Sequence, residues 1–250
     1  MSDDLFTGPE SKIRRAQRLV AELEGCIQQF LRHGACSVEV HEDPASGSHT
    51  LKVVTTNPLP EDIPLIIGDA ANNLRSSLDI LVSAFIRKAG GNVAVGSLPI
   101  HETRDALEGA LQRSEIQKVR PDVADFILNS VRPYKDGNFE IWALSKLDNV
   151  SKHRLVIPVV AVTRLSGISA RDDNNNTFNI NNMTVTVDHG RIMNLIQTGA
   201  RMHITNPGQP AIAVLFDQGY PFENQSVVQT LHHLASHVSS VVQSFRALAL

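Results

Sequence analysis

The stretch EDIPLIIGDAANNLRSSLDILVSAFIRK, residues 61–88, decides the fold because it predicts one long helix. Pro58, Pro60 and Pro64 mark the start of this helix, and Gly90-Gly91 marks its end. Apolar side chains recur along it at helical spacing and form one stripe, made of Ala70, Leu74, Leu78, Leu81 and Phe85. We therefore expect a helix that packs one face against a hydrophobic core.

The opposite side of this helix carries short polar side chains instead of the Glu, Lys and Gln that favour an exposed helix. Asn, Ser and Asp are weaker helix formers because their side chains compete for backbone hydrogen bonds. Three interpretations stay open, namely a buried hydrogen-bond network, a ligand or catalytic site, and a plain solvent-exposed face. Arg75 and Asp79 are four residues apart and can form an ion pair. The candidate site residues on this side are Asp69, Asn72, Asn73, Arg75, Ser76 and Asp79.

A second candidate site is the Lys-His-Arg run at residues 152–154, which follows a predicted helix at about Phe139–Val150. Cations at the C-terminal end of a helix are favoured by its dipole, by about 0.3–1 kcal/mol each when exposed. The alternative is an anion site in which an imidazole takes part in proton transfer and is oriented by Asp148 and Asp69. That alternative requires the two helices to pack together. Its basic members are Lys152, His153 and Arg154.

The rest of the chain predicts an α+β fold rather than an alternating α/β fold. The first helix is expected to begin at a Thr7 cap and to stop at Gly34, and a β-hairpin follows with residues 44–47 as its turn. From Leu155 onward, apolar runs separated by Asn, Gly and Pro predict an antiparallel sheet. We expect one domain over residues 1–250, with a helical part and its hairpin at about 1–154, the sheet at about 155–220 and a C-terminal amphipathic helix at about 225–250.

The composition limits the class of protein. A chain of 250 residues with 42% hydrophobic residues can bury a sizeable core. The formal charge of −3 argues against a general nucleic-acid-binding chain, which needs a basic excess, although it leaves room for a local basic patch. No apolar run reaches the roughly 20 residues that cross a bilayer, and Cys26 and Cys36 lack metal-site spacing. We expect a cytoplasmic protein that has no membrane contact.

Two motifs resemble a widespread group of uncharacterised bacterial proteins. Residues 67–69 (Ile-Gly-Asp), 73–76 (Asn-Leu-Arg-Ser) and 78–79 (Leu-Asp) resemble that group's Gly-Asp followed by Asn-Leu-Arg-Ser-Ala-Leu-Asp-His on a long helix. Residues 147–154, Leu-Asp-Asn-Val-Ser-Lys-His-Arg, resemble its later Leu-Asp-Asn-Ile-Asp-Lys-His-Arg, and Pro133-Tyr134 also fits. The resemblance spans roughly Glu61 to Leu155.

The first motif also resembles the signature of HEPN domains, the nucleotide-binding helical domains of many bacterial toxins and defence proteins. In that signature an Arg is followed, after four to six residues, by a His. The resemblance implies a metal-independent ribonuclease that needs no cofactor and works as a homodimer, in a defence or stress context. A His can take the proton from a ribose 2′-hydroxyl, and an Arg can hold the phosphate and its developing charge.

Arg75 matches the arginine of that signature, but Ile80 stands where the histidine is expected. Isoleucine can neither accept nor donate a proton, so ribonuclease activity requires another base, for which His153 is the candidate. We therefore expect binding of a nucleotide or RNA, with cleavage in doubt. The alternative is a non-enzymatic homodimeric or partner-binding interaction module.

Three further features are expected to be structural. His233 and His237 are four residues apart on the last helix and could share a metal ion, but no third ligand is near in sequence, so we expect a solvated face. His101-Glu102 is expected in a cap or turn. Trp142, the only tryptophan, is expected in the core rather than as a base-stacking platform.

Overall fold

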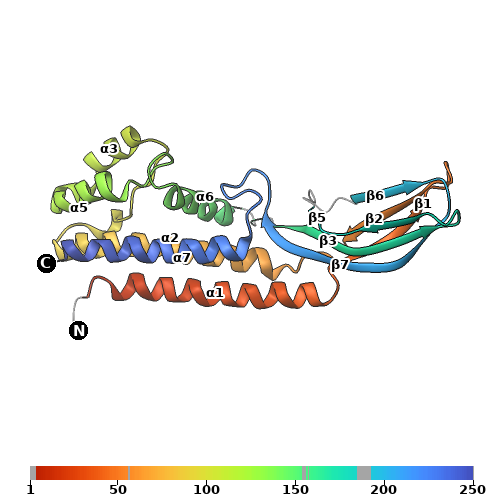
Figure 1. Ribbon diagram of the computed structural model, residues 1–250. Helices are drawn as coiled ribbons and strands as arrows, with labels where there is room; N and C mark the ends of the chain where they lie inside the picture. Colours follow the sequence, from red (N-terminus) through yellow and green to blue (C-terminus); the bar gives the residue numbers. More distant parts are fainter. Residues whose placement is uncertain (1–3, 56, 154–155, 157, 185–192, 250) are drawn as a thin grey trace.

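The computed structural model describes residues 4–55, 57–153, 156, 158–184 and 193–249. The chain forms an elongated molecule, with its helices at one end and its strands at the other (Figure 1). All pairings between the described strands of the sheets are antiparallel, so the predicted α+β class is confirmed.

Four long helices form most of the helical part: α1 (Thr7–Arg32), α2 (Asp62–Lys88), α6 (Phe139–His153) and α7 (Val227–Ser244). The predicted apolar stripe of α2 is buried, and none of its five side chains is more than 1% exposed. At the end far from the sheets, the ring of Phe85 lies 6.5 Å from that of Phe6 and 5.9 Å from that of Phe245. These aromatic contacts join the start of α1, the end of α2 and the residue that follows α7.

Short helical segments connect α2 to α6. They are η1 (Val93–Val95), α3 (Arg104–Gln112), α4 (Glu115–Val119), α5 (Pro121–Phe126) and the π-helical turn η2 (Ile127–Val131), while η3 (Phe245–Leu248) follows α7. The helix that begins at Pro121 changes from α-helical to π-helical geometry at Ile127. Arg132 ends η2 in the left-handed conformation, with φ at 55°.

The beginning of α1 differs from the sequence prediction. Thr7 is the first helical residue rather than the cap, and the capping position is Phe6, whose side chain has no hydrogen-bonding group. The carboxylate of Asp4 takes over this role, accepting hydrogen bonds from the Phe6 amide at 3.1 Å and from the Thr7 hydroxyl at 2.9 Å. The predicted stop is confirmed, because Gly34 has a φ of +81° that favours glycine.

The strands form two sheets. The first contains β1 (Cys36–Glu42), β2 (His49–Thr55) and β6 (Met193–Thr198), in the order β1-β2-β6. The second is built around β3 (Pro158–Asp172), which pairs with β4 (Thr177–Ile180), β5 (Met183–Thr184) and β7 (Met202–Phe216). One hydrophobic cluster joins the sheets, with Leu51 and Val53 from β2 packed among residues of β3, β4 and β7.

This arrangement corrects the predicted organisation. The β1-β2 hairpin belongs with the sheets and not with the helical part, because its apolar face is covered by strands that come more than 100 residues later. Within the part that was expected to form the sheet, residues 202–216 form one long strand, β7, and residues 193–198 form β6. The predicted single antiparallel sheet is therefore two sheets that share a core.

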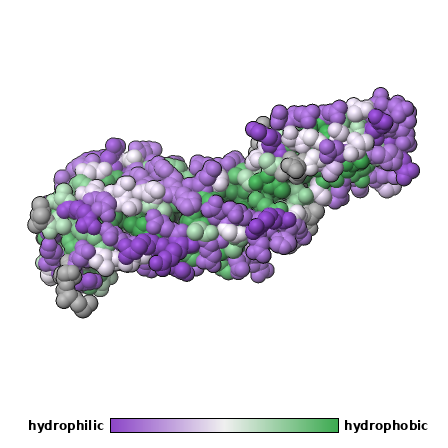
Figure 2. All heavy atoms as spheres, turned by 60° about the horizontal axis from the view of Figure 1, so that its bottom comes forward, coloured by the Kyte–Doolittle hydropathy of each residue, from purple (hydrophilic) through white to green (hydrophobic). Residues whose placement is uncertain are grey.

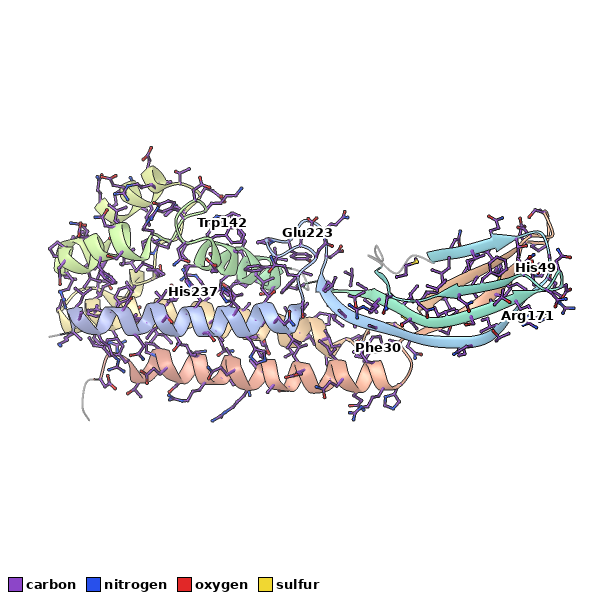
Figure 3. All side chains as sticks on the ribbon, in the orientation of Figure 1. Phe30, His49, Trp142, Arg171, Glu223 and His237 are labelled. Atoms are coloured by element: carbon purple, nitrogen blue, oxygen red, sulfur yellow. The ribbon has the colours of Figure 1, made fainter. Side chains whose placement is uncertain are left out.

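A small apolar cluster lies at the junction of the two parts. Phe30 near the end of α1 packs with Ala35 and with Val160 of β3, and Figure 3 labels Phe30 at this junction. Figure 2 shows hydrophobic residues gathered where the helices meet the sheets, on a face that is otherwise largely hydrophilic. Among the described helices, none combines the length and the apolar character that a bilayer-spanning segment needs.

Candidate functional site

The polar side of α2 is covered by the chain itself. Nη2 of Arg75 donates a hydrogen bond to the Leu98 carbonyl at 2.8 Å, and the Leu98 amide donates to Oδ1 of Asp79 at 2.9 Å. One turn further on, the Ser83 hydroxyl donates to the Gly96 carbonyl at 2.5 Å. Three successive turns of α2 thus fasten the segment at residues 96–98, and we call these contacts the α2 clip.

The predicted pair of Arg75 and Asp79 is confirmed, with 2.8 Å between Nη1 and Oδ1. Nη1 has no partner in hydrogen-bond geometry among the described residues, so this contact is an ion pair rather than a hydrogen bond. Burial raises the pKa of Asp79, and the Arg75 charge and the Leu98 amide only partly oppose that shift. The Arg75 side chain is 13% exposed, so a bound phosphate would have to displace the contacts of the α2 clip.

A second network connects α2 to α6. The carboxylate of Asp148, a residue that is only 1% exposed, accepts hydrogen bonds from Nδ2 of Asn72 at 2.9 Å and from Nζ of Lys152 at 2.6 Å. The charge of Lys152 lowers the pKa of Asp79 and the charge of Asp148 raises it, so this network adjoins the α2 clip. The two sequence motifs therefore meet in space, and the packing that the second candidate site required is confirmed.

The other predicted residues of α2 have local roles. The Asn73 side chain donates to the Asp69 carbonyl at 2.8 Å, which is a bond within the helix. Asp69, Asn72 and Lys152 line a small cavity of about 230 Å³ between α2 and the end of α6. Ser76 is half-buried, and its hydroxyl has no hydrogen bond within the described part of the chain.

Two positions bear on the expected catalytic base, namely His153 and Ile80. The side chain of His153 and the whole of Arg154 lie outside the described residues. Ile80 lies against α1, because a Cβ atom added to Gly8 would come within 3.0 Å of Ile80 Cγ2. Five residues along a helix correspond to about 140° around its axis, so position 80 faces α1 while Arg75 faces Leu98.

A groove of about 710 Å³ runs along the other side of α6. It is lined by the loop at residues 219–221, by Glu102, and by Trp142, Lys146, Asn149 and Val150 of α6. A smaller adjoining cavity of about 190 Å³ shares the α6 residues. It adds His101 and Ser145 to the lining.

Trp142 on α6, labelled in Figure 3, lines this groove. Its indole Nε1 donates to Oε2 of Glu102 at 3.1 Å, and Lys146 forms an ion pair with the same carboxylate. The Nζ atoms of Lys135 and Lys146 lie 5.4 and 5.5 Å from the centre of the Trp142 ring. The hydrogen bond from Lys146, together with Trp142 and the charge of Lys135, lowers the pKa of Glu102 and keeps it ionised.

The sequence prediction missed this groove. Trp142 was expected in the core, but it is only half-buried, and Glu102 does more than cap a turn. The signal was present, because Trp142, Lys146 and Asn149 recur at helical spacing on the face of α6 opposite to the buried Ile141, Leu144 and Leu147.

The expected solvated face of α7 is confirmed for His233, which is exposed, whereas His237 is half-buried. The rings of His233 and His237 stack with their centres 6.2 Å apart, and His233 Nε2 lies 3.6 Å from Glu140 Oε1. His237 is half-buried and forms a hydrogen bond of 2.9 Å with Asn138, and burial lowers its pKa. Within the described ranges, no group of three or more His, Cys, Asp or Glu side chains could hold a metal ion.

Comparisons of this chain with protein-family models, with curated proteins and with solved structures find no match. The HEPN-like resemblance, and the homodimer and the ribonuclease chemistry that it implies, therefore stay predictions.

Proposed function

We propose that the protein binds nucleotides or single-stranded RNA in the groove along α6 and does not cleave them. The observation that carries this proposal is the position of the only tryptophan, which lines a groove with two lysine ammonium groups close to its ring. An aromatic platform with cations beside it is the usual means of binding a nucleobase and its phosphate without sequence preference.

Stacking of a base on the indole ring of Trp142 is more favourable than the contacts of the ring with the two lysines. A cation–π contact at an exposed site contributes about 0.5–1 kcal/mol, whereas stacking of a base on an aromatic side chain contributes about 1–3 kcal/mol. A base can therefore replace either Lys135 or Lys146 over Trp142, and the displaced ammonium group can pair with a phosphate. The amide of Asn149 and the hydroxyl of Ser145 can hydrogen-bond to the edge of the base. A groove of about 710 Å³ is in the range of small-ligand sites.

The polar side of α2 supports binding without cleavage. Metal-independent cleavage of RNA needs a proton acceptor within hydrogen-bond reach of the 2′-hydroxyl. Arg75 is engaged with Leu98 and Asp79, and Ile80 faces α1. We therefore infer that the α2 clip stabilises the fold and that the α6 groove binds the ligand.

Tryptophan fluorescence tests this proposal directly, because Trp142 is the only tryptophan and lines the groove. Titration of the full chain with AMP, UMP or a short single-stranded RNA is expected to quench its emission with saturation. Lys146→Ala removes one cation of the groove and is expected to weaken binding about three- to tenfold. Lys118→Ala is the matched control, since Lys118 is also an exposed lysine paired with a glutamate, but on α4.

Gel analysis of the same RNA after incubation tests the second half of the proposal, and the RNA is expected to stay intact with the parent protein. Absence of any saturable quenching by the parent contradicts the binding proposal. Equal affinities for Lys146→Ala and Lys118→Ala contradict the assignment to the α6 groove. Cleavage that Arg75→Ala abolishes without loss of fold contradicts the claim that Arg75 is structural.

A further inference from the structure

The loop between η2 and α6, residues 132–138, is held in an unusual conformation. Arg132 is left-handed, and its carbonyl accepts hydrogen bonds from the amides of Tyr134 at 2.7 Å and Asn138 at 2.8 Å. A Cβ atom on Gly137 would come within 2.5 Å of the Arg132 carbonyl and 2.7 Å of Tyr134 Cζ, so the loop closes only over glycine. A left-handed conformation of a residue other than glycine costs on the order of 1–3 kcal/mol, and such residues cluster at binding sites.

Two arginines converge on the hydroxyl of Tyr134. Nε of Arg132 donates a hydrogen bond to it at 3.1 Å, and Arg104, the first residue of α3, lies near enough to lower the pKa of this hydroxyl. The Tyr134 ring is only 6% exposed, so the position of the hydroxyl is fixed. Nη2 of Arg104 donates to Oδ1 of Asn129 at 2.7 Å, which fixes the second guanidinium group.

Arg104 and Arg132 bond to uncharged side chains here, and the carboxylate of Asp125 is joined to Arg104 only through Asn129, whose Nδ2 donates to Asp125 at 2.7 Å. Neither Arg104 nor Arg132 has a carboxylate partner within the described part of the chain, although both side chains are exposed. The hydrogen bond from Arg132 and the nearby charges lower the pKa of Tyr134, despite some opposition from burial. A phenol oxygen accepts two hydrogen bonds and donates one, so its proton is available to a further acceptor. Two guanidinium groups and one hydroxyl proton form a set of donors that matches the oxygens of a phosphate.

We propose that Arg104, Arg132 and the Tyr134 hydroxyl form a binding site for a phosphate group, separate from the α6 groove. The separation follows from the backbone, because the Pro133 carbonyl accepts from the His101 amide at 3.1 Å and the Glu102 carbonyl accepts from the Lys135 amide at 3.3 Å. Side chains alternate along such an extended pair. Lys135 therefore reaches Trp142 on one side, while Tyr134 points to the other.

Calorimetric titration of the full chain with inorganic phosphate tests this site, with O-phosphoserine and AMP as the two ester sources and adenosine as the control without phosphate. The parent is expected to bind inorganic phosphate and not adenosine at this site. Arg104→Gln and Arg132→Gln are each expected to weaken phosphate binding at least about fivefold, which is the loss of one charge-assisted hydrogen bond. Arg113→Gln, at the other end of α3, is the matched control and is expected to bind as the parent does.

A spectroscopic titration gives a second readout that does not depend on affinity. In a Tyr220→Phe background Tyr134 is the only tyrosine, and its ultraviolet titration is expected to begin below its ordinary pKa of 10.0. Saturating phosphate is expected to shift that titration upward, since the anion repels the phenolate and accepts a hydrogen bond from the protonated phenol. The shift is expected to be absent in Arg132→Gln.

Equal phosphate affinities for Arg132→Gln and Arg113→Gln, or a Tyr134 titration that phosphate does not move, overturn this proposal. Binding of AMP alone, with no binding of inorganic phosphate or phosphoserine, also overturns it. The outcome is independent of the proposed function, because quenching of Trp142 by nucleotides is expected to be unchanged in Arg132→Gln. Loss of phosphate binding without loss of nucleotide binding is therefore measurable in a single set of variants.

Discussion

Replacing Arg75 with alanine is expected to lower the free energy of unfolding by about 3 kcal/mol. The Leu98 carbonyl, on a residue that is 1% exposed, loses the hydrogen bond from Nη2. A buried acceptor without a partner costs about 1–3 kcal/mol. Asp79 also loses its counter-ion, and breaking a fully buried pair costs about 3–5 kcal/mol. Because the Asp79 side chain is 31% exposed, we place the total at the lower end of that range.

The pH dependence of this loss separates an electrostatic role from simple packing. The pKa of Asp79 is raised above its ordinary 3.8, so the stability that this shift represents is fully present below about pH 3.8 and is lost as the pH rises through the folded-state pKa. Arg75 lowers that pKa, so Arg75→Ala raises it further. The difference between parent and variant is therefore expected to be larger at about pH 7 than at about pH 4.

Urea unfolding at the two pH values measures both quantities, with Arg87→Ala as the matched control on the same helix. Arg87 is exposed, so its replacement is expected to change stability by no more than about 0.5 kcal/mol. If Arg75→Ala and Arg87→Ala unfold at the same urea concentration, the α2 clip does not stabilise the fold. If the loss is the same at both pH values, the ion pair with Asp79 is not its cause.

Two further changes test the packing of each part. Asp148→Ala is expected to lower the free energy of unfolding, measured with urea, by about 2–3 kcal/mol, because two side-chain donors lose their buried acceptor. Asn149→Ala, on the exposed face of α6, is the control and is expected to change this free energy little. Equal effects of the two substitutions would refute the buried network. Gly208→Ala is expected to lower the free energy of unfolding by about 2 kcal/mol or more, and the thermal midpoint with it, because φ is +65° and the new Cβ would lie 2.5 Å from the Ser166 carbonyl. Gly199→Ala is the control, because a Cβ at position 199 would meet nothing within 4 Å. If the Gly208 variant is as stable as the Gly199 variant, β7 adjusts freely to the added Cβ.

The sequence by itself determined the helices and the faces that they bury. Helical periodicity in residues 61–88 predicted α2 and its apolar stripe, and the amphipathic pattern at about 225–250 predicted α7; the apolar faces of both helices are buried in the structure. It also predicted the pair of Arg75 and Asp79, since residues four apart on a helix are neighbours wherever the helix lies. These are local features, and local geometry alone determines them.

Only the tertiary structure decided which surfaces stay open. The polar side of α2 was compatible with a catalytic site until residues 96–98 and α6 were seen to cover it, and Trp142 was compatible with a core position until its face of α6 was seen to line a groove. The same holds for the β1-β2 hairpin, whose cover comes from strands after residue 157. Periodicity shows that a helix or strand has two faces, but contacts between residues far apart in sequence determine what each face meets.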